Sequence, residues 1–169
     1  TFDKEINKKE TNDVSKDKNI EKLYKNIISE SELNVFLDDI KNYKEVSIDL
    51  ETTDIDANKA DIVGISFCYK PNEGYYIPLL YPEKTNKSLD KNFILSQIKV
   101  FLESGKHKFI GQNIKYDTVV LKRHGIELSK IYFDTMIAES LLSPEKNSYK
   151  LDLLSLDYLN YKMQPIESL

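Results

Sequence analysis

The chain has 169 residues, of which 40% are hydrophobic and 31% charged, and its formal net charge is −4. This length suits one domain with its own core, and the single cysteine, Cys68, excludes a disulfide framework. No apolar run approaches the roughly 20 residues that span a bilayer, so we expect no membrane partner. The negative charge argues against a protein that binds nucleic acid through bulk electrostatics alone.

The first twenty residues differ from the rest of the chain. Residues 1–20 are polar, alternate in charge and show no apolar period, which predicts a mobile leader. The ordered domain is expected over residues 21–169. Because the chain starts with Thr1 rather than Met, we also expect it to be a piece of a longer protein.

Apolar periodicity predicts strands and helices in alternation after the leader. A β-prone run lies at 23–28, and Ser29 or Ser31 can cap a helix that ends at Ile40. Strands are expected at 45–51, 62–69 and 74–79, and a short turn makes the last two antiparallel. There follow a helix at 90–103, a strand at 108–111, a helix at 115–124, an extended piece at 131–133, a helix at 136–142 capped by Asp134, and an amphipathic helix around 151–159.

This order of elements predicts the fold class. Three leading antiparallel strands, followed by helix, strand, helix and strand, indicate an α/β fold in which helices flank a mixed sheet. The order is similar to that of the RNase H-like architecture.

The strand at 45–51 carries the first candidate site. Its apolar residues alternate with Ser47, Asp49 and Glu51, so the two carboxylates project from the same face of the strand. Two anions this close repel each other unless a divalent cation lies between them. Carboxylates without histidine or thiolate nearby favour Mg²⁺ or Mn²⁺. The alternative is a solvated strand face that happens to carry two acids.

The segment from Gly111 to Asp117 carries the second candidate site, where a short buried strand leads into a helix. Asp117 falls in the first helical turn, at the carboxyl end of a strand, where open α/β sheets bind ligands. Asn113 is placed to cap the helix, Lys115 can meet a phosphate, and Tyr116 offers a ring for stacking or for core packing. The alternative is an ordinary helix start, in which Asn113 caps and Asp117 complements the helix dipole.

In this order and at this separation, the two segments resemble the first and second motifs of the 3′–5′ exonuclease domains of family A DNA polymerases, the bacterial polymerase I type. The likeness extends to Val63–Phe67, Tyr76–Pro78, Gly125–Leu128 and Phe133–Met136, within roughly residues 24–161. The lysine- and asparagine-rich composition further suggests a location in the apicoplast, the plastid of a malaria-type parasite.

The resemblance implies a proofreading 3′–5′ exonuclease that uses two divalent ions, Mg²⁺ or Mn²⁺, in its complete site. By that resemblance, Asp49 and Glu51 would ligate one ion, and Asp49 would bridge to a second ion held by Asp117. The ions would activate water and stabilise the leaving 3′ oxygen.

The resemblance also implies the substrate and the parent protein. Thr52 would touch the terminal sugar, and Ile55 would wedge against the last base of a single-stranded DNA 3′ end. The remaining substrate-binding positions would be Gln112, Asn113, Lys115 and Tyr116. A polymerase domain would follow on the C-terminal side in the parent chain.

The third motif of the family is missing. It consists of a tyrosine with an aspartate four residues later, and no tyrosine of this chain has an aspartate at that distance. We expect the motif beyond Leu169, which would leave the chain without one ligand. Three further acids, Asp134, Asp152 and Asp157, are interpreted as helix caps or members of solvated helix faces.

Two other functions remain open. An RNase D-like 3′–5′ exoribonuclease would share the metal site and differ only in its substrate. A catalytically silent exonuclease fold could instead serve as a DNA-binding scaffold, although loss of function usually removes the ligands, and Asp49, Glu51 and Asp117 are all present.

Overall fold

Strand β2 lies inside a six-stranded mixed sheet with the order β1-β4-β3-β2-β5-β6, in a computed structural model that describes residues 22–81 and 89–164. It pairs antiparallel with β3 and parallel with β5, and β3 pairs antiparallel with β4. The edge strands β1 and β6 run parallel to their neighbours β4 and β5. The strands are β1 (Leu23–Asn26), β2 (Glu45–Thr52), β3 (Ile62–Lys70), β4 (Glu73–Pro78), β5 (Lys108–Gly111) and β6 (Ile131–Asp134). The predicted α/β fold with a mixed sheet is confirmed.

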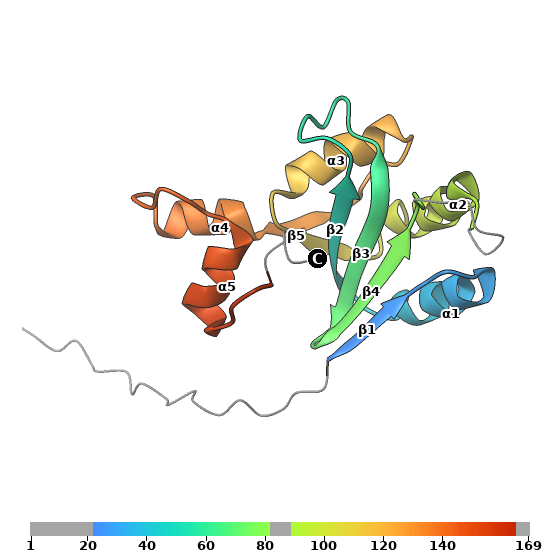
Figure 1. Ribbon diagram of the computed structural model, residues 1–169, viewed down its shortest axis with the longest axis horizontal. Helices are drawn as coiled ribbons and strands as arrows, with labels where there is room; N and C mark the ends of the chain where they lie inside the picture. Colours follow the sequence, from blue (N-terminus) through green and yellow to red (C-terminus); the bar gives the residue numbers. More distant parts are fainter. Residues whose placement is uncertain (1–21, 82–88, 165–169) are drawn as a thin grey trace, which may run out of the picture.

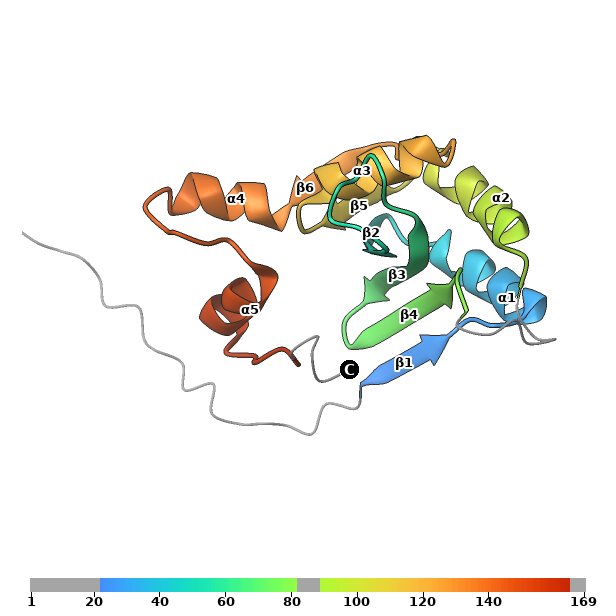
Figure 2. The same cartoon turned by 45° about the horizontal axis from the view of Figure 1, so that its top comes forward.

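Helices α1, α2 and α3 lie along one side of the sheet, whereas α4 and α5 project away from it beyond β6 (Figures 1 and 2). The helices are α1 (Glu30–Ile40), α2 (Lys91–Leu102), α3 (Ile114–Arg123), α4 (Thr135–Leu142) and α5 (Leu151–Leu159). Within the described ranges, none of them is long and apolar enough to cross a bilayer.

The alternation of β2 separates the core from the open face of the sheet. Val46, Ile48 and Leu50 are buried in one hydrophobic cluster with side chains of α1, α2 and α3. Burying side chains of this size contributes about 1.5–3 kcal/mol each. Asp49 and Glu51 point the other way and remain exposed, so the core fixes the strand and the strand presents the acids.

Most predicted elements are present, with ends that shift by one or two residues. Ser29 caps α1 in a capping box with Glu32, which confirms the first of the two predicted caps. The β-prone run at 23–28 contains β1, which joins the sheet beside β4, a pairing that the sequence did not predict. The leader predicted at 1–20 lies outside the described residues.

Candidate active site

Asp117 reaches β2 because β5 is shorter than β2. β5 pairs with β2 only from Glu45 to Ser47, so the carboxyl-terminal half of β2 has no strand neighbour on that side. α3 begins just after β5 and contacts β2 there. Asp117 lies in its first turn, is only 3% exposed, and receives a hydrogen bond from the backbone of Leu50. The two predicted motifs are therefore neighbours in space.

Asp134 fixes the start of α3. Its carboxylate accepts hydrogen bonds from the backbone N–H of Asn113 (3.1 Å) and Ile114 (2.9 Å). It also caps its own helix, α4, by accepting from Met136 (2.9 Å) and Ile137 (3.3 Å). The predicted capping role of Asp134 is confirmed, and one carboxylate holds the first turns of two helices.

The predicted capping role of Asn113 is wrong. Asn113 occupies the N-cap position of α3, but its backbone is left-handed, with φ 55°, and its side chain makes no capping hydrogen bond. A usual N-cap residue has extended backbone geometry, which aims its side chain at the helix N–H groups. Asp134 supplies the acceptor from another part of the chain, which leaves the amide of Asn113 beside the neighbouring hollow.

Asp49, Glu51 and Asp117 form a row of interacting like charges. Burial, and then the Glu51 carboxylate, raise the pKa of Asp49 to about 6. Burial, and then Asp49, raise the pKa of Asp117 to about 7, while the hydrogen bond from the Leu50 backbone offsets part of this rise. The Asp49 side chain still contacts solvent, so water moderates its shift more than that of Asp117. In the part of the chain that the structure describes, no cationic side chain is among the groups that shift the pKa of Asp49 or Asp117.

The chemistry of these three groups fits a hard divalent cation, because all three offer carboxylate oxygens and their repulsion would be relieved by positive charge. These three carboxylates do not by themselves form a complete metal-binding group. Among residues 22–81 and 89–164, no three His, Cys, Asp or Glu side chains are grouped so as to hold a metal ion. The metal-binding roles of Asp49, Glu51 and Asp117 therefore stay predictions.

A hollow of about 580 Å³ follows the end of β2 and is lined by four of the six predicted substrate-binding residues. Its lining includes Thr52, Ile55, Asn113 and Tyr116. The Tyr116 hydroxyl lies 2.6 Å from Thr52 Oγ1 and donates to the Asp54 carbonyl oxygen, so the tyrosine is fixed against the end of β2. Ile55 is 96% exposed at the rim. An apolar side chain this exposed can contact a ligand without first leaving a core.

The other two predicted substrate-binding residues lie elsewhere. The side-chain amide of Gln112 donates to the Tyr149 carbonyl oxygen (2.7 Å) and accepts from the Thr135 hydroxyl, so it ties the start of α3 to the segment before α5. Lys115 is exposed on α3 and does not line the hollow. Their substrate-binding roles remain predictions.

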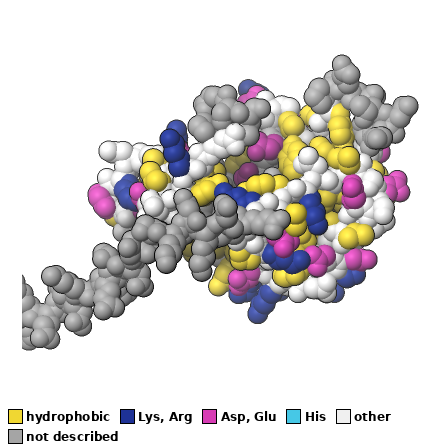
Figure 3. All heavy atoms as spheres, turned by 60° about the horizontal axis from the view of Figure 1, so that its bottom comes forward, with side chains coloured by type: hydrophobic (Ala, Val, Ile, Leu, Met, Phe, Trp, Pro, Cys, Tyr) yellow, Lys and Arg dark blue, Asp and Glu magenta, His cyan; other side chains and the backbone are white. Residues whose placement is uncertain are grey.

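A second hollow, of about 340 Å³, opens on the uncovered face of the sheet and includes Asp49 in its lining. The ring of Tyr76 lies across Gly64 there, where an added Cβ would stand 2.1 Å from the tyrosine hydroxyl oxygen. On the face shown in Figure 3, acidic and basic side chains are interspersed and hydrophobic side chains fill much of the space between them. The described side chains that are visible in this view form no continuous basic surface.

Comparisons with known proteins agree on one family. The sequence model of a 3′–5′ exonuclease family matches residues 24–167. DNA polymerase I of Borreliella burgdorferi is 38% identical over 139 residues, which cover 82% of this chain and 15% of that protein. DNA polymerase I of Pseudomonas aeruginosa is 31% identical over 141 residues, again 82% of this chain and 15% of that protein. The chain thus spans about 15% of the length of these curated relatives.

Solved structures share the fold at lower identity. The POL domain of Pol1 from M. smegmatis, in complex with DNA primer-template and dNTP, matches with a TM-score of 0.65 and 18% identity over 85% of this chain and 24% of that one. Escherichia coli RNase D matches with a TM-score of 0.64 and 17% identity over 86% and 36%. Brucella melitensis NrnC with bound Mg²⁺ matches with a TM-score of 0.59 and 14% identity over 83% and 62%. The RNase H-like fold is confirmed.

Replacing Asp134 with Ala should lower the free energy of unfolding by about 2–4 kcal/mol, because two helix caps worth about 1–2 kcal/mol each are lost together. Urea unfolding measures the change. Asp152→Ala, at an exposed acid in the first turn of α5, is the matched control and should change stability by less than about 0.5 kcal/mol. Equal effects of the two substitutions would contradict the capping role.

The raised pKa of Asp117 predicts a stability that falls as pH rises. Its pKa is about 7 in the folded chain against a usual 3.8, so between these values the folded state binds more protons than the unfolded state, and stability declines with pH. Asp117→Asn should remove the larger part of this decline and leave the smaller part that comes from Asp49, whose pKa is raised to about 6. The variant should be more stable than wild type near pH 8, by on the order of 4 kcal/mol at most.

Urea unfolding in EDTA, from about pH 4.5 to about pH 8, tests this linkage. Asp152→Asn should keep the wild-type slope because that acid is exposed and is not among the groups that shift the pKa of Asp49 or Asp117. If Asp117→Asn keeps the full decline as well, Asp117 does not carry the unbalanced charge.

Proposed function

This chain belongs to the 3′–5′ exonuclease family of family A DNA polymerases, and we propose that it removes nucleotides from the 3′ end of single-stranded DNA during proofreading. The observation that carries the proposal is the meeting of the two motifs. Asp49 and Asp117 come from segments 68 residues apart in sequence, yet α3, which carries Asp117 in its first turn, contacts β2, which carries Asp49. Burial, and then Asp49, raise the pKa of Asp117. The hollow for a strand end is lined by Thr52 and Tyr116, which are the sequence neighbours of Glu51 and Asp117.

The three carboxylates would hold divalent ions, Mg²⁺ or Mn²⁺, with two ions in the complete site. Such ions, when bound, supply activation of a water molecule and stabilisation of negative charge on the leaving oxygen. The protein's part is to hold Asp49 and Glu51 on a strand whose other face is locked in the core. Asp117 is held by a helix whose start is fixed by Asp134. Rigid elements place reacting groups better than loops do.

The hollow would receive the terminal nucleotide. Thr52 and Tyr116 hold each other through their hydroxyls, so the wall next to the acids is fixed before substrate arrives. Ile55 would pack against the last base from the rim. In the reaction, the oxygen of water bonds to the terminal phosphorus while the bond from phosphorus to the 3′ oxygen breaks, and a nucleoside monophosphate leaves.

Three further points belong to this proposal. A polymerase domain would follow in the parent chain, as expected from relatives named DNA polymerase I. A fourth carboxylate would come from the third motif, because two of the acids outside the row already have other partners. Asp134 caps two helices and Asp157 pairs with Lys146 at 2.8 Å. The plastid location remains a prediction from composition.

The RNase D-like alternative predicts a different substrate. RNase D shares the fold at 17% identity, whereas the polymerase relative is 38% identical over most of this chain, which favours DNA. Matched single-stranded DNA and RNA oligonucleotides, offered in one competition assay, separate the two. Preference for RNA would support the alternative.

In the full-length protein, replacing Asp49 and Glu51 together with Asn should reduce 3′–5′ excision by at least about a thousandfold, since neutral amides do not hold the divalent ions. Excision of a labelled single-stranded oligonucleotide and primer extension are measured in parallel. Polymerisation should be unchanged because it would use a separate site. Undiminished excision by the double variant would contradict the proposal that Asp49 and Glu51 hold the divalent ions.

The 169-residue chain by itself should bind at most one divalent ion weakly and excise slowly, because affinity depends on the number of carboxylate ligands. Isothermal titration with Mn²⁺, beside a nuclease assay, tests both expectations. Tight binding of two ions with rapid excision would mean that Asp134, Asp152 or Asp157 completes the site.

A further inference from the structure

The loop of residues 53–61 joins β2 to β3 and begins two residues after Glu51. It carries Ile55, whose side chain is almost fully exposed. A loop that holds an exposed side chain in one place needs its own attachments, because chain ends fixed in a sheet do not fix a tip several residues away. Side chains of α3, of the residue that follows it and of α2 supply several attachments of this loop.

The base of the loop is closed by two hydrogen bonds between Thr53 and Asp61. The backbone N–H of Thr53 donates to the Asp61 carbonyl oxygen (3.0 Å), and the backbone N–H of Asp61 donates to Thr53 Oγ1 (2.9 Å). On the side near the acids, Tyr116 donates to the Asp54 carbonyl oxygen. The first turn of α3 therefore holds the rising half of the loop.

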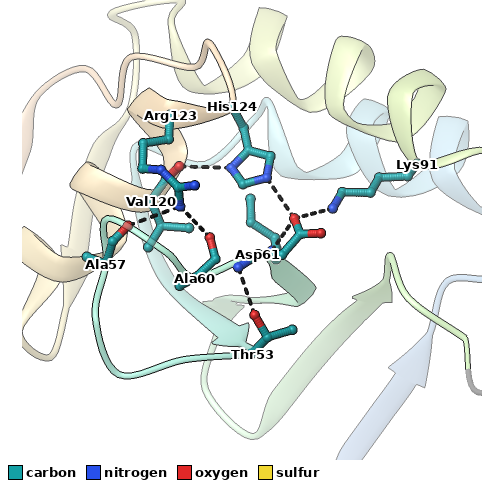
Figure 4. A network of polar contacts seen from close by, with 9 residues as sticks. Thr53, Ala57, Ala60, Asp61, Lys91, Val120, Arg123 and His124 are labelled. Carbon is teal, nitrogen blue, oxygen red and sulfur yellow. Dashed lines mark hydrogen bonds and ion pairs between the residues drawn. The ribbon is translucent and has the colours of Figure 1, made fainter.

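The last turn of α3 holds the returning half (Figure 4). Arg123 donates from Nη1 to the carbonyl oxygens of Ala60 (2.6 Å) and Ala57 (3.2 Å). The Asp61 carboxylate lies 2.8 Å from His124 Nε2 and also receives Lys91 from the start of α2. The pKa of Asp61 is lowered to about 2, chiefly by Lys91 and further by His124, so this carboxylate stays ionised.

These contacts make α3 a common support for Asp117 and for the loop. The helix has 10 residues, which corresponds to roughly 15 Å of length. Tyr116 holds the loop at one end of that length, and Arg123 and His124 hold it at the other. Ile55 lies in sequence between the two attachments, so its position relative to Asp117 depends on both.

We propose that Arg123, with the Asp61–His124 pair, is a positioning group that sets where Ile55 stands over the hollow, and hence where the 3′-terminal nucleotide lies relative to Asp117. This role rests on the proposed exonuclease function. Arg123 does not touch the substrate. It acts by holding the Ala57 and Ala60 carbonyls, so its removal lets the loop tip move while the strand and the acids stay in place.

A double-mutant cycle in the full-length protein tests the role, with Ile55→Ala, Arg123→Met and the double variant. The readout is the single-turnover rate of removing the last nucleotide from a single-stranded oligonucleotide. Each single substitution should slow the rate about tenfold, and the double variant should also be slowed about tenfold, because effects that act through one contact do not multiply. A slowing of about a hundredfold in the double variant would mean independent effects and would overturn the proposal.

Two variants serve as controls. Lys122→Met removes a positive charge from the neighbouring residue of α3, which lines a hollow with Lys99 and Glu103 and donates to none of the carbonyls of the loop within the described residues. It should change the rate by less than about twofold. Arg123→Lys keeps a donor that can reach a carbonyl and should restore part of the rate. Equal rates for Arg123→Met and Lys122→Met would contradict the proposal.

Amide hydrogen exchange gives a readout that does not depend on activity. Arg123→Met should speed exchange in residues 56–61 while residues 46–50 of β2 stay protected. Unchanged exchange in the loop overturns the positioning role. If the wild-type protein excises no nucleotides, the proposed function and this role are both overturned. If the wild type is active but the rate effects of Ile55→Ala and Arg123→Met multiply in the double variant, only the positioning role is overturned.

Discussion

The carboxylate of Asp134 holds the backbone N–H groups that open both α3 and α4. N–H groups at a helix start have no partner within the helix and must find one elsewhere. α3 begins where β5 has ended and β2 continues without a strand neighbour on that side. This acceptor, together with the burial of Ile114 in the core, holds the first turn of α3 against β2. The location of Asp117, and with it the meeting of the two acidic motifs, depends on that placement.

The same placement destabilises the fold, because it brings carboxylates together where part of their charge is buried. Asp117 is buried beside β2, and both Asp117 and Asp49 have raised pKa values, chiefly because burial disfavours their charged forms. A neighbouring carboxylate adds to each rise, Glu51 for Asp49 and Asp49 for Asp117. Perturbed carboxylates of this kind concentrate at functional sites, because a charge that destabilises the fold alone can be balanced by a ligand. The hydrophobic core offsets this destabilisation, since the buried side chains of Val46, Ile48 and Leu50 hold β2 in place while its open face carries the acids.

Local patterns in the sequence predicted most of the fold. Alternation in β2, the cap at Ser29 and the antiparallel turn between β3 and β4 are decided by residues close together in the chain. The position of β1 beside β4 and the cap of α3 by Asp134 depend on partners far apart in sequence. A single sequence carries no signal for such pairings. The prediction that Asn113 caps α3 is wrong for the same reason. Its residue type suits an N-cap position, but its backbone is left-handed.

The candidate site divides in the same way. Asp49, Glu51 and Asp117 could be predicted because their motifs are short, whereas Arg123, His124 and Asp61 lie in no motif and meet only when the loop folds over α3. These two sets differ in what they must do. A metal-binding residue must be of one chemical type at one position, so a short sequence motif can predict it. A positioning residue needs only a hydrogen-bond donor on a side chain that is long enough. Here the guanidinium of Arg123 donates to two backbone carbonyl oxygens of the loop. Since carbonyl oxygens are offered by every residue, such a contact constrains the loop without constraining its sequence, and it becomes visible only in the folded structure.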